Sequence, residues 1–466
     1  MQTVLVKDVS TDKVDKLKTS LRGLLLRPND AQYEQARKVY NGMIDKRPGL
    51  IAQVSDTADV ITAVRFASEN NVTVAIRGGG HNGGGLGTCE GGLVVDLSQM
   101  KGVRVDPRSR TVRAEGGCVW GDVDHASHGF GLATASGVIS TTGVGGLTLG
   151  GGIGHLTRKC GLTIDNLLEV DIVLADGRFV TASSQENHDL FWAVRGGGGN
   201  FGVVTSFLFK LHPISTVYAG PILWHLDQAK EVMQFYRDFI VKAPDEVNGF
   251  FAFLVVPPGP PFPEALHNKK MCGIVWCYTG PLEKAEETFK PVRALGTPAL
   301  DFLGPIPHPA LQSMFDPIYP PGLQWYWRAD FVNELSDEAI ALHSKYGSAL
   351  PSMHSTMHLY PIDGAAHRVG RNDTAFSYRE SKWAEVIVAV DPDPAKINGM
   401  IPWVKDYWSA LHPHSAGGAY VNFMMDEGQE RVQATYRDNY DRLVAIKKKY
   451  DPNNVFHVNQ NIRPSQ

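Results

Sequence analysis

Apolar residues recur at helical spacing twice near the start of the chain, each time close to a continuous apolar run. The positions at helical spacing are Val14, Leu17, Leu21 and Leu24, then Val60, Ala63, Val64 and Ala67. Ser10 or Thr11 can cap the first predicted helix, and Asp56 or Thr57 the second. Apolar runs over 48–54 and 72–76 are typical of strands on either side of the second helix. The pattern therefore predicts a β-α-β unit.

Shorter runs of the same kind continue to about residue 180. Residues 103–105 and 111–114 are predicted strands. A helix should follow with an inward face made of Trp120, Val123 and Ala126. The Asp-Gly turn within 175–178 then predicts a β-hairpin.

The pattern changes after residue 212, where glycine clusters give way to proline-rich connections. Predicted strands cover 249–256, 271–278, 356–360, 375–378 and 384–390, and predicted helices cover 226–241 and 282–295. Strands that alternate with helices in this way, without glycine-rich turns, are typical of an antiparallel sheet backed by helices.

Three glycine-rich segments stand beside predicted strands, at 78–87, 143–154 and 195–202. Glycine lets bare backbone come close to a ligand. In the first segment Arg77 stands at the mouth and His81 in the middle, and phosphate is the obvious candidate ligand. Three such segments together predict an extended ligand that is laid along the backbone.

The first segment also matches a dinucleotide fingerprint at Gly78, Gly80 and Gly83, with Asp96 at a suitable interval. That fingerprint needs a crossover helix directly after the glycines. Residues 82–92 are glycine-rich and lack apolar periodicity, which disfavours a Rossmann unit and an NAD dehydrogenase. A plain turn and a nest of N–H groups around pyrophosphate remain open for this segment alone.

Composition mainly excludes classes of protein. The 466 residues suit two domains, and the net charge of −4, without clustered Lys and Arg, predicts no nucleic-acid partner. No apolar run reaches the roughly 18 residues of a membrane span, and residues 1–8 lack a secretory pattern, so a cytoplasmic protein without a membrane partner is expected. The five cysteines form no Cys-x-x-Cys pair, which predicts reduced thiols and no metal site.

Longer motifs identify a family. They are Arg77-Gly-Gly-Gly-His81, Gly143-Val-Gly-Gly, Gly-Gly-Gly-Ile-Gly154, Gly161-Leu-Thr-Ile-Asp-Asn-Leu167, Arg195-Gly-Gly-Gly-Gly-Asn-Phe-Gly202, Tyr420-Val-Asn-Phe423 and Tyr450-Asp-Pro-Asn-Asn-Val-Phe456. In this order they resemble the FAD domain of the vanillyl-alcohol-oxidase superfamily and the tail of its berberine-bridge-enzyme-like branch. The resemblance covers nearly the whole chain.

The resemblance implies an α+β protein of three parts. An FAD-binding domain made of two small α/β lobes would occupy 1–212, with its FAD core at about 46–212. A substrate domain with an antiparallel sheet backed by helices would occupy 213–417 and roof the flavin. A C-terminal segment, 418–466, would return to the FAD domain.

The resemblance also implies that His81 carries FAD through a covalent bond from a ring nitrogen to the 8α-methyl carbon of the flavin. Neutral imidazole is nucleophilic near neutral pH, which suits this role. Many relatives attach the flavin a second time through a cysteine before the Gly-Val-Gly-Gly run. This chain has Ile139 at that place, so a single covalent link is expected.

The remaining FAD contacts are implied in the same way. Around the pyrophosphate and isoalloxazine they are Arg77, Gly78, Gly79, Gly80, His81 and Asn82. Along the pyrophosphate and ribityl chain they are Ser136, Gly137, Thr142, Gly143 and Gly146, followed by Gly151, Gly154 and His155. Adenine would meet Val203 and Val204, and the flavin would accept or donate hydrogen bonds at Asn422 and Asn459.

The second half of the chain offers candidate substrate contacts. Alternation sends Trp325 and Trp327 to one face of a predicted strand and Tyr326 to the other, and a core role and a ligand platform are both open. One face of another predicted strand carries His354, His358 and Tyr360. That face is a candidate pocket wall.

The catalytic base is not fixed by the motifs. The plant founder of the family has a glutamate eleven residues before the arginine that corresponds to Arg379, and this chain has Arg368 there, so the founder's ring-closing chemistry is not expected. Possible bases are Tyr420, Tyr378 and His367. Tyr420 is preferred because Asn422 of the same motif should touch the flavin. Its pKa must fall from about 10 for this role, and a structural Tyr420 stacked on the cofactor is an equal alternative.

The predicted function is an FAD-dependent oxidase. It would take a hydride from a C–OH or C–N carbon of a small aromatic, alkaloid-like or sugar substrate to flavin N5, and it would reduce molecular oxygen to hydrogen peroxide. The resemblance links oxygen access to the small residue Thr148. A dehydrogenase with another acceptor and a non-catalytic flavin-containing binding protein are the alternatives, and a monomer or a homodimer would be compatible with each.

Overall fold

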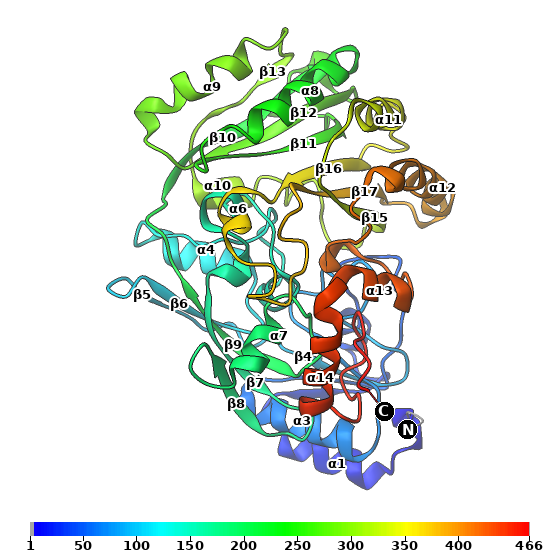
Figure 1. The fold of residues 1–466 in the computed structure, drawn as a ribbon. Helices are drawn as coiled ribbons and strands as arrows, with labels where there is room; N and C mark the ends of the chain where they lie inside the picture. The colour runs from blue at the N-terminus through cyan, green and yellow to red at the C-terminus, as the bar shows by residue number, and fades with distance from the viewer. Residues whose placement is uncertain (1–3, 466) are drawn as a thin grey trace.

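The computed structural model describes residues 4–465. Residues 1–3, with which the N-terminal segment considered above begins, lie outside the described residues. The strands of the described part form three sheets, and helices α1 (Thr11–Ser20) and α3 (Thr57–Glu69) lie at one end of the molecule (Figure 1). In the same part of the chain no helix combines the length and the apolar character needed to cross a membrane.

The first sheet has the strand order β1-β2-β4-β3, with bounds β1 (Leu24–Leu26), β2 (Leu50–Gln53), β4 (Leu93–Asp96) and β3 (Val74–Arg77). Strands β2, β4 and β3 are parallel, and β1 is antiparallel to β2. Helix α3 (Thr57–Glu69) connects β2 to β3, and the side chain of Asp56 caps it by accepting the N–H of Asp59. The predicted β-α-β unit is therefore confirmed.

The first predicted helix is shorter than expected. Helix α1 (Thr11–Ser20) ends before Leu21, and Leu24 belongs to strand β1. The backbone N–H groups of Arg22 and Gly23 donate to the Asp59 carboxylate at 2.8 and 2.9 Å. These bonds and the pairing with β2 end the helix at Ser20. The apolar periodicity predicts a longer helix.

The second sheet is antiparallel and has the order β5-β6-β9-β7-β8, with bounds β5 (Val103–Asp106), β6 (Thr111–Glu115), β9 (Val203–Lys210), β7 (Leu167–Val173) and β8 (Phe179–Ser183). The predicted hairpin at 175–178 joins β7 to β8. Helix α4 (Trp120–His128) follows β6, and helix α7 (His188–Val194) connects β8 to β9. The short helix α2 (Tyr33–Ala36) lies between β1 and β2, and the short helix α6 (Thr157–Cys160) precedes β7.

The third sheet is the largest and is antiparallel throughout. Its order is β13-β10-β12-β11-β16-β17-β15, and β14 also pairs with β10. The bounds are β10 (Thr216–His225), β11 (Val247–Val255), β12 (Lys270–Tyr278), β13 (Leu300–Asp301), β14 (Gly304–Pro307), β15 (Gln324–Val332), β16 (Thr356–Pro361) and β17 (Trp383–Asp391). One expected strand, 375–378, is wrong. There the Ala375 N–H donates to Arg195 O and the Tyr378 hydroxyl donates to Ala434 O, and the described residues give this run no strand pairing.

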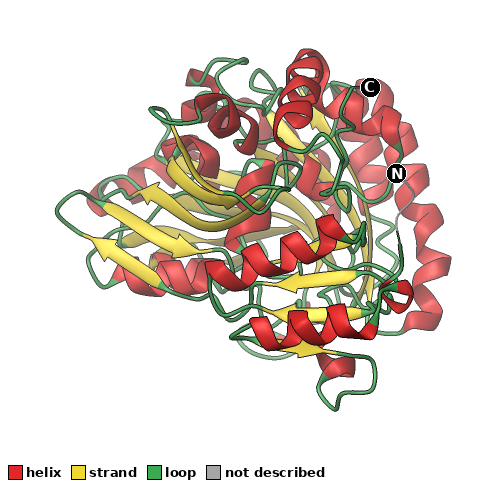
Figure 2. Cartoon of the chain, turned by 90° about the horizontal axis from the view of Figure 1, so that it is seen from below, coloured by secondary structure: helices red, strands yellow, loops and turns green. Residues whose placement is uncertain are grey.

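Helices cover the outer face of the third sheet (Figures 1 and 2). They are α8 (Ala229–Ile240), α9 (Ala285–Arg293), α11 (Asp337–Gly347) and α12 (Pro394–Leu411). Their apolar sides pack with alternate strand residues such as Ile274, Trp276 and Ile387 into one core. The predicted sheet backed by helices is confirmed, and its other face is left to contribute to the cavity described below.

A buried lysine connects the end of the chain to the part that contains the three glycine-rich segments. After α13 (Gln429–Tyr436), helix α14 (Tyr440–Tyr450) packs on α7 (Figure 1). Lys447 Nζ donates to Asn200 O, Asp451 Oδ2 and Phe456 O at 2.7, 2.7 and 2.8 Å. An ammonium group has three N–H donors, so each is used. Lys447 therefore ties α14, the third glycine segment and the tail together.

Replacing Lys447 by Met should lower the free energy of unfolding by about 3–5 kcal/mol, because it leaves Asp451 buried without its counter-charge. The control is Lys449→Met on the same helix. Its ion pair with Asp189 is exposed, with 58% of the lysine side chain accessible against 0% for Lys447, and its loss should cost about 0–1 kcal/mol. Urea unfolding of both variants measures the difference, and equal losses would contradict the role given to Lys447.

Candidate active site

A cavity of about 340 Å³ is lined by residues of all three sheets and of the C-terminal segment. One wall contains glycines of all three glycine-rich segments, including Gly78, Gly143 and Gly199. Strands β15, β16 and β17 contribute aromatic and aliphatic side chains to the rest. The three segments predicted to act together thus meet around one space.

The glycines of this wall have two different structural roles. A Cβ added to Gly79 would lie 2.4 Å from Gly143 N, and one added to Gly143 would lie 2.4 Å from Gly79 N. The first two segments therefore touch backbone to backbone, which only glycine permits. Gly146 and Gly199 also line the cavity, but no atom of residues 4–465 beyond the adjoining backbone lies within 4 Å of the position that their Cβ atoms would take. These two glycines keep space open.

The first segment presents backbone donors without a free arginine. Within residues 4–465 the N–H groups of residues 79–82 donate no hydrogen bond. Arg77 lines the cavity, but its buried guanidinium lies 2.8 Å from the Asp96 carboxylate, its cross-strand partner. Asp96, which completed the dinucleotide fingerprint, is thus an ion-pair partner. An anion in this place would be met by backbone N–H groups, as in a nest.

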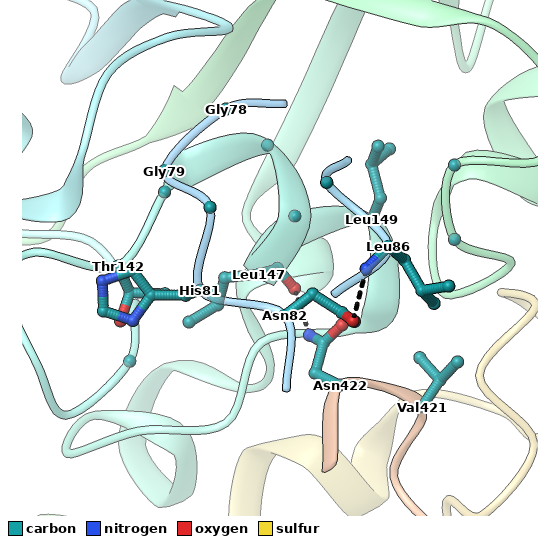
Figure 3. Close-up of a pocket in the computed structure, with 18 of the residues that line it drawn as sticks. Gly78, Gly79, His81, Asn82, Leu86, Thr142, Leu147, Leu149, Val421 and Asn422 are labelled. Atoms are coloured by element: carbon teal, nitrogen blue, oxygen red, sulfur yellow. Dashed lines mark hydrogen bonds between the residues drawn. The ribbon is translucent and has the colours of Figure 1, made fainter. Parts of the chain in front are cut away.

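The second segment is partly helical. Residues Val144–Gly150 form the short helix α5, whose Leu147 and Leu149 line the cavity (Figure 3). Thr148 is fully buried and is not among the lining residues. The position of Thr148 therefore gives no support to the argument that linked its size to oxygen access.

His81 is a neutral, half-buried imidazole on the cavity wall. Its ring stacks on Tyr40 with 3.9 Å between centroids, and Nε2 lies 3.1 Å from Thr141 Oγ1. Desolvation lowers the pKa of His81 to about 4, and a hydrogen bond with the Thr141 backbone opposes the shift. At neutral pH one ring nitrogen therefore keeps its lone pair. Figure 3 shows the side chain leaving the segment that carries Gly78 and Gly79.

Tyr420 and Asn422 lie on the cavity wall as a hydrogen-bonded pair. Asn422 Nδ2 donates to Leu147 O at 3.0 Å (Figure 3) and to Tyr420 OH at 2.7 Å. Gly152 N also donates to that hydroxyl. Burial raises the pKa of Tyr420 to about 12, although both donors oppose the shift. The lowered pKa that a Tyr420 base requires is thus not provided by the protein.

Strand β16 brings a second histidine to the cavity. His358 Nδ1 lies 2.6 Å from Tyr360 OH, and both residues line the space. Burial lowers the pKa of His358 to about 3 and raises that of Tyr360. The predicted shared face is confirmed for these two residues, whereas His354 precedes the strand and does not line the cavity.

Aromatic rings of β15 complete this part of the wall. Trp325 and Trp327 both line the cavity, and Tyr326 packs into the core under the helices. The predicted alternation is confirmed. The position of the two tryptophans favours a ligand platform over a role in the core alone.

The other candidates divide into wall residues and supports. Besides those already placed, the lining includes Gly80, Asn82, Gly137, Thr142, Val204 and Asn459. Outside it lie Ser136, Gly151, Gly154, His155, Val203, Tyr378 and His367. Val203 points into the core of the first sheet because alternation along β9 leaves Val204 on the cavity side. Tyr378 stacks on Phe331 with 4.5 Å between ring centroids, and His367 bonds to Ser381 O.

Several wall residues gave no signal in the sequence. Tyr40 and Tyr319 stand in connections without periodicity, and only the fold brings them together. Asn200 was within reach of prediction, because it belongs to the third glycine motif.

The lining as a whole has little charge. Among the described residues that line the cavity there is no Asp, Glu or Lys, and Arg77 is neutralised by Asp96. No group of three or more His, Cys, Asp or Glu within residues 4–465 is arranged to hold a metal ion. The site therefore offers backbone donors, neutral imidazoles, phenols and indoles.

Comparison with known proteins gives these features a family context. The family described as FAD binding domain matches residues 48–183, and the family described as berberine and berberine like matches residues 419–463. An FAD-linked oxidoreductase of Dictyostelium discoideum is 32% identical over 462 residues, with 98% of each chain covered. The (R)-6-hydroxynicotine oxidase of Paenarthrobacter nicotinovorans is 27% identical over 465 residues, covering 96% of this chain and 97% of that protein.

A solved structure supports the same family relationship. The crystal structure of 6-hydroxy-D-nicotine oxidase from Arthrobacter nicotinovorans superimposes with a TM-score of 0.86 at 26% identity, covering 96% of this chain and 99% of that one. The predicted α+β fold, the FAD-binding domain and the FAD-dependent oxidase class are confirmed. This chain belongs to the berberine-bridge-enzyme-like family of FAD-linked oxidoreductases.

Proposed function

We propose that FAD lies along the glycine-rich wall of the cavity, bonded to His81, and that a small uncharged substrate is oxidised against the wall formed by β15 and β16. The observation that carries this proposal is one cavity in which unpaired N–H groups and a neutral histidine stand on one wall, and aromatic side chains without free charge on another. Molecular oxygen is the proposed electron acceptor.

The residues present fit FAD in three respects. Gly146 and Gly199 leave open space where any side chain would intrude. The N–H groups of residues 79–82 would hold the pyrophosphate. Asn459 Oδ1 is buried without a hydrogen-bond partner in the described residues, although Nδ2 of the same side chain donates to Gly199 O and Phe456 O, so this oxygen is available to a donor on the cofactor.

The bond to His81 is chemically balanced with oxygen as the oxidant. A ring nitrogen of His81 forms a bond to the 8α carbon of FAD, one C–H and one N–H proton are released, and two electrons pass to O2, giving hydrogen peroxide. The neutral imidazole supplies the required lone pair. Because Ile139 replaces the cysteine that many relatives use, His81 would be the one point of attachment.

The cavity lining favours an uncharged substrate. A cationic or anionic group would enter a space without a counter-charge, at the cost of its hydration. Trp325 and Trp327 suit an aromatic or alkaloid-like molecule, and sugar rings also pack on such surfaces. The relative named for 6-hydroxynicotine supports the alkaloid-like class for this chain.

When FAD is bound, it accepts a hydride from the substrate carbon, and the protein must receive the accompanying proton. We assign this role to His358, which is neutral and lines the cavity. If Nδ1–H donates to Tyr360 OH, then Nε2 is free to accept the proton. Burial makes His358 a weak base, so the proton should move together with the hydride and not before it.

Purified protein should be yellow and should keep its flavin in the acid precipitate, with the flavin mass on the peptide that contains His81. The His81→Ala variant should bind FAD and release all of it on precipitation. Anaerobic mixing with a panel of aryl alcohols, amines and sugars should bleach the flavin with at least one compound, and air should restore the colour with formation of hydrogen peroxide. Colourless protein would contradict the proposal.

Replacing His358 by Ala should slow flavin reduction by about 10²-fold or more, because the general base is lost. His354→Ala is the matched control, since His354 lies just before β16 and outside the cavity lining. Stopped-flow reduction with the best substrate measures both rates at equal flavin content. Similar rates for the two variants would exclude His358 as the general base.

The pH dependence of kcat/KM should show no ionisation with the usual pKa of a histidine. Because burial lowers the pKa of His358 from 6.5 to about 3, its neutral form is fully present above about pH 5 and is lost only as the pH falls further. For an alcohol substrate, kcat/KM between pH 5 and 8 should therefore lack a limb with a midpoint near 6.5. Such a limb in the wild type would contradict this role.

A further inference from the structure

One short segment positions His81 indirectly from two sides. It belongs to the part of the chain after residue 212, which we call the substrate half. The segment, residues 313–319, runs between helix α10 (His308–Gln312) and strand β15. On one side Tyr319 O accepts the hydroxyl of Tyr40 at 2.5 Å, and the Tyr40 ring stacks on His81. The backbone of Tyr40 also donates to Gly80 O at 3.0 Å, directly before His81.

The other side of the imidazole is reached through residues 140–141. The Asp316 carboxylate accepts two hydrogen bonds from Ser140, from Oγ at 2.5 Å and from the backbone N–H at 3.2 Å. Ser140 precedes Thr141, whose hydroxyl lies 3.1 Å from His81 Nε2. Asp316 thus fixes the place of the group that meets one ring nitrogen, and Tyr319 fixes the ring that covers one face of the imidazole.

We infer that residues 313–319 are a positioning segment for the attachment of FAD to His81, acting through Tyr40 and Thr141. This inference rests on the proposed function, because it needs the bond between His81 and the cofactor. It assigns a task to Tyr40, Thr141, Asp316 and Tyr319 that no comparison gives them.

The contact with Thr141 suggests the reacting nitrogen. A neutral imidazole carries one N–H, and we assign it to Nε2, where the Thr141 hydroxyl can accept it, so that the lone pair stands on Nδ1. Nδ1 would then form the bond to the 8α carbon. That carbon gives up a proton and two electrons, the imidazole gives up its N–H proton, and O2 takes the two electrons. Stacking on Tyr40 limits rotation of the ring, so the lone pair keeps its direction, and orientation of this kind accelerates bond formation.

The arrangement makes the substrate half a condition for cofactor attachment. The glycine-rich segments carry His81, but the groups that orient it are fixed by a segment of the other half of the chain. None of these hydrogen bonds uses the N–H groups of residues 79–82, which would bind FAD in the proposed function. The structure therefore separates retention of FAD from bond formation, and variants can test each by itself.

The test uses the full-length protein, prepared without flavin and then mixed with FAD in air. Three quantities are followed: total bound flavin by absorbance, flavin that survives acid precipitation, and the mass of the peptide with His81. Thr141→Val and Asp316→Ala should slow bond formation at least tenfold while total FAD binding changes less than twofold. Tyr40→Phe, which loses the hydroxyl but keeps the ring, should slow it several-fold.

Two controls keep the result specific. Thr141→Ser restores the hydroxyl and should restore the rate of bond formation. Ser313→Ala alters an exposed residue of the same segment. Among the described residues its hydroxyl bonds to Pro309 O and Ala310 O of helix α10 and not to the His81 environment, so this variant should behave as wild type. Thermal unfolding of each variant confirms that it is folded before FAD is added.

The outcomes distinguish the inference from the proposed function. Wild-type protein that never bonds FAD to His81 would overturn the proposed attachment itself. Wild type that forms the bond, with Thr141→Val and Asp316→Ala equally fast, would overturn only the positioning segment. Loss of total flavin in proportion to the bonded flavin would also overturn it, because that result shows a structural role in holding FAD.

Discussion

The site depends on a contact between two stretches of bare backbone. Gly79 and Gly143 approach so closely that a methyl group on either would meet the other's backbone nitrogen at 2.4 Å. This approach brings the first glycine segment against the start of α5 and leaves the N–H groups of residues 79–82 without partners in the described chain. Side chains at these positions would separate the segments, and the wall that carries His81 would not form.

The second constraint is the pairwise neutralisation of charge around this wall. Arg77 pairs with Asp96, Lys447 with Asp451, and Arg379 makes two hydrogen bonds with Asp165. Each pair joins segments or caps a turn near the glycine clusters, and none leaves a free charge on the cavity lining. Removing one partner of such a pair would leave an uncompensated buried charge. Within such a neutral cavity, charge that develops during oxidation is met mainly by hydrogen bonds and by the proton transfer itself.

Much of this arrangement could be predicted because local patterns specified it. The spacing of Val60 and Val64 specified α3, and alternation placed Trp325 and Trp327 on one face. Predictions from local patterns were wrong where contacts between distant residues determine the secondary structure. The chain leaves α1 because the Asp59 carboxylate accepts the N–H groups that follow the helix. Residues 375–378 are largely aromatic and apolar, but they pair with no strand among the described residues. Tyr40 stacks on His81, and Asp316 and Tyr319 act on it only indirectly, through Ser140 and Tyr40. These contacts form only after distant parts of the chain assemble, so no spacing in the sequence could reveal them.

The same long-range assembly is consistent with the different tasks that we propose for two histidines with similar pKa shifts. Burial keeps both His81 and His358 neutral, so both have a lone pair at neutral pH. His81 is stacked on Tyr40 and bonded at Nε2, which suits a side chain that reacts once and then stays in place. His358 has a phenol, Tyr360, as its partner, and a phenol can donate or accept as the imidazole gains and loses a proton. In the function that we propose, the partner of each ring, more than its pKa, therefore separates the attachment of FAD at His81 from proton transfer at His358.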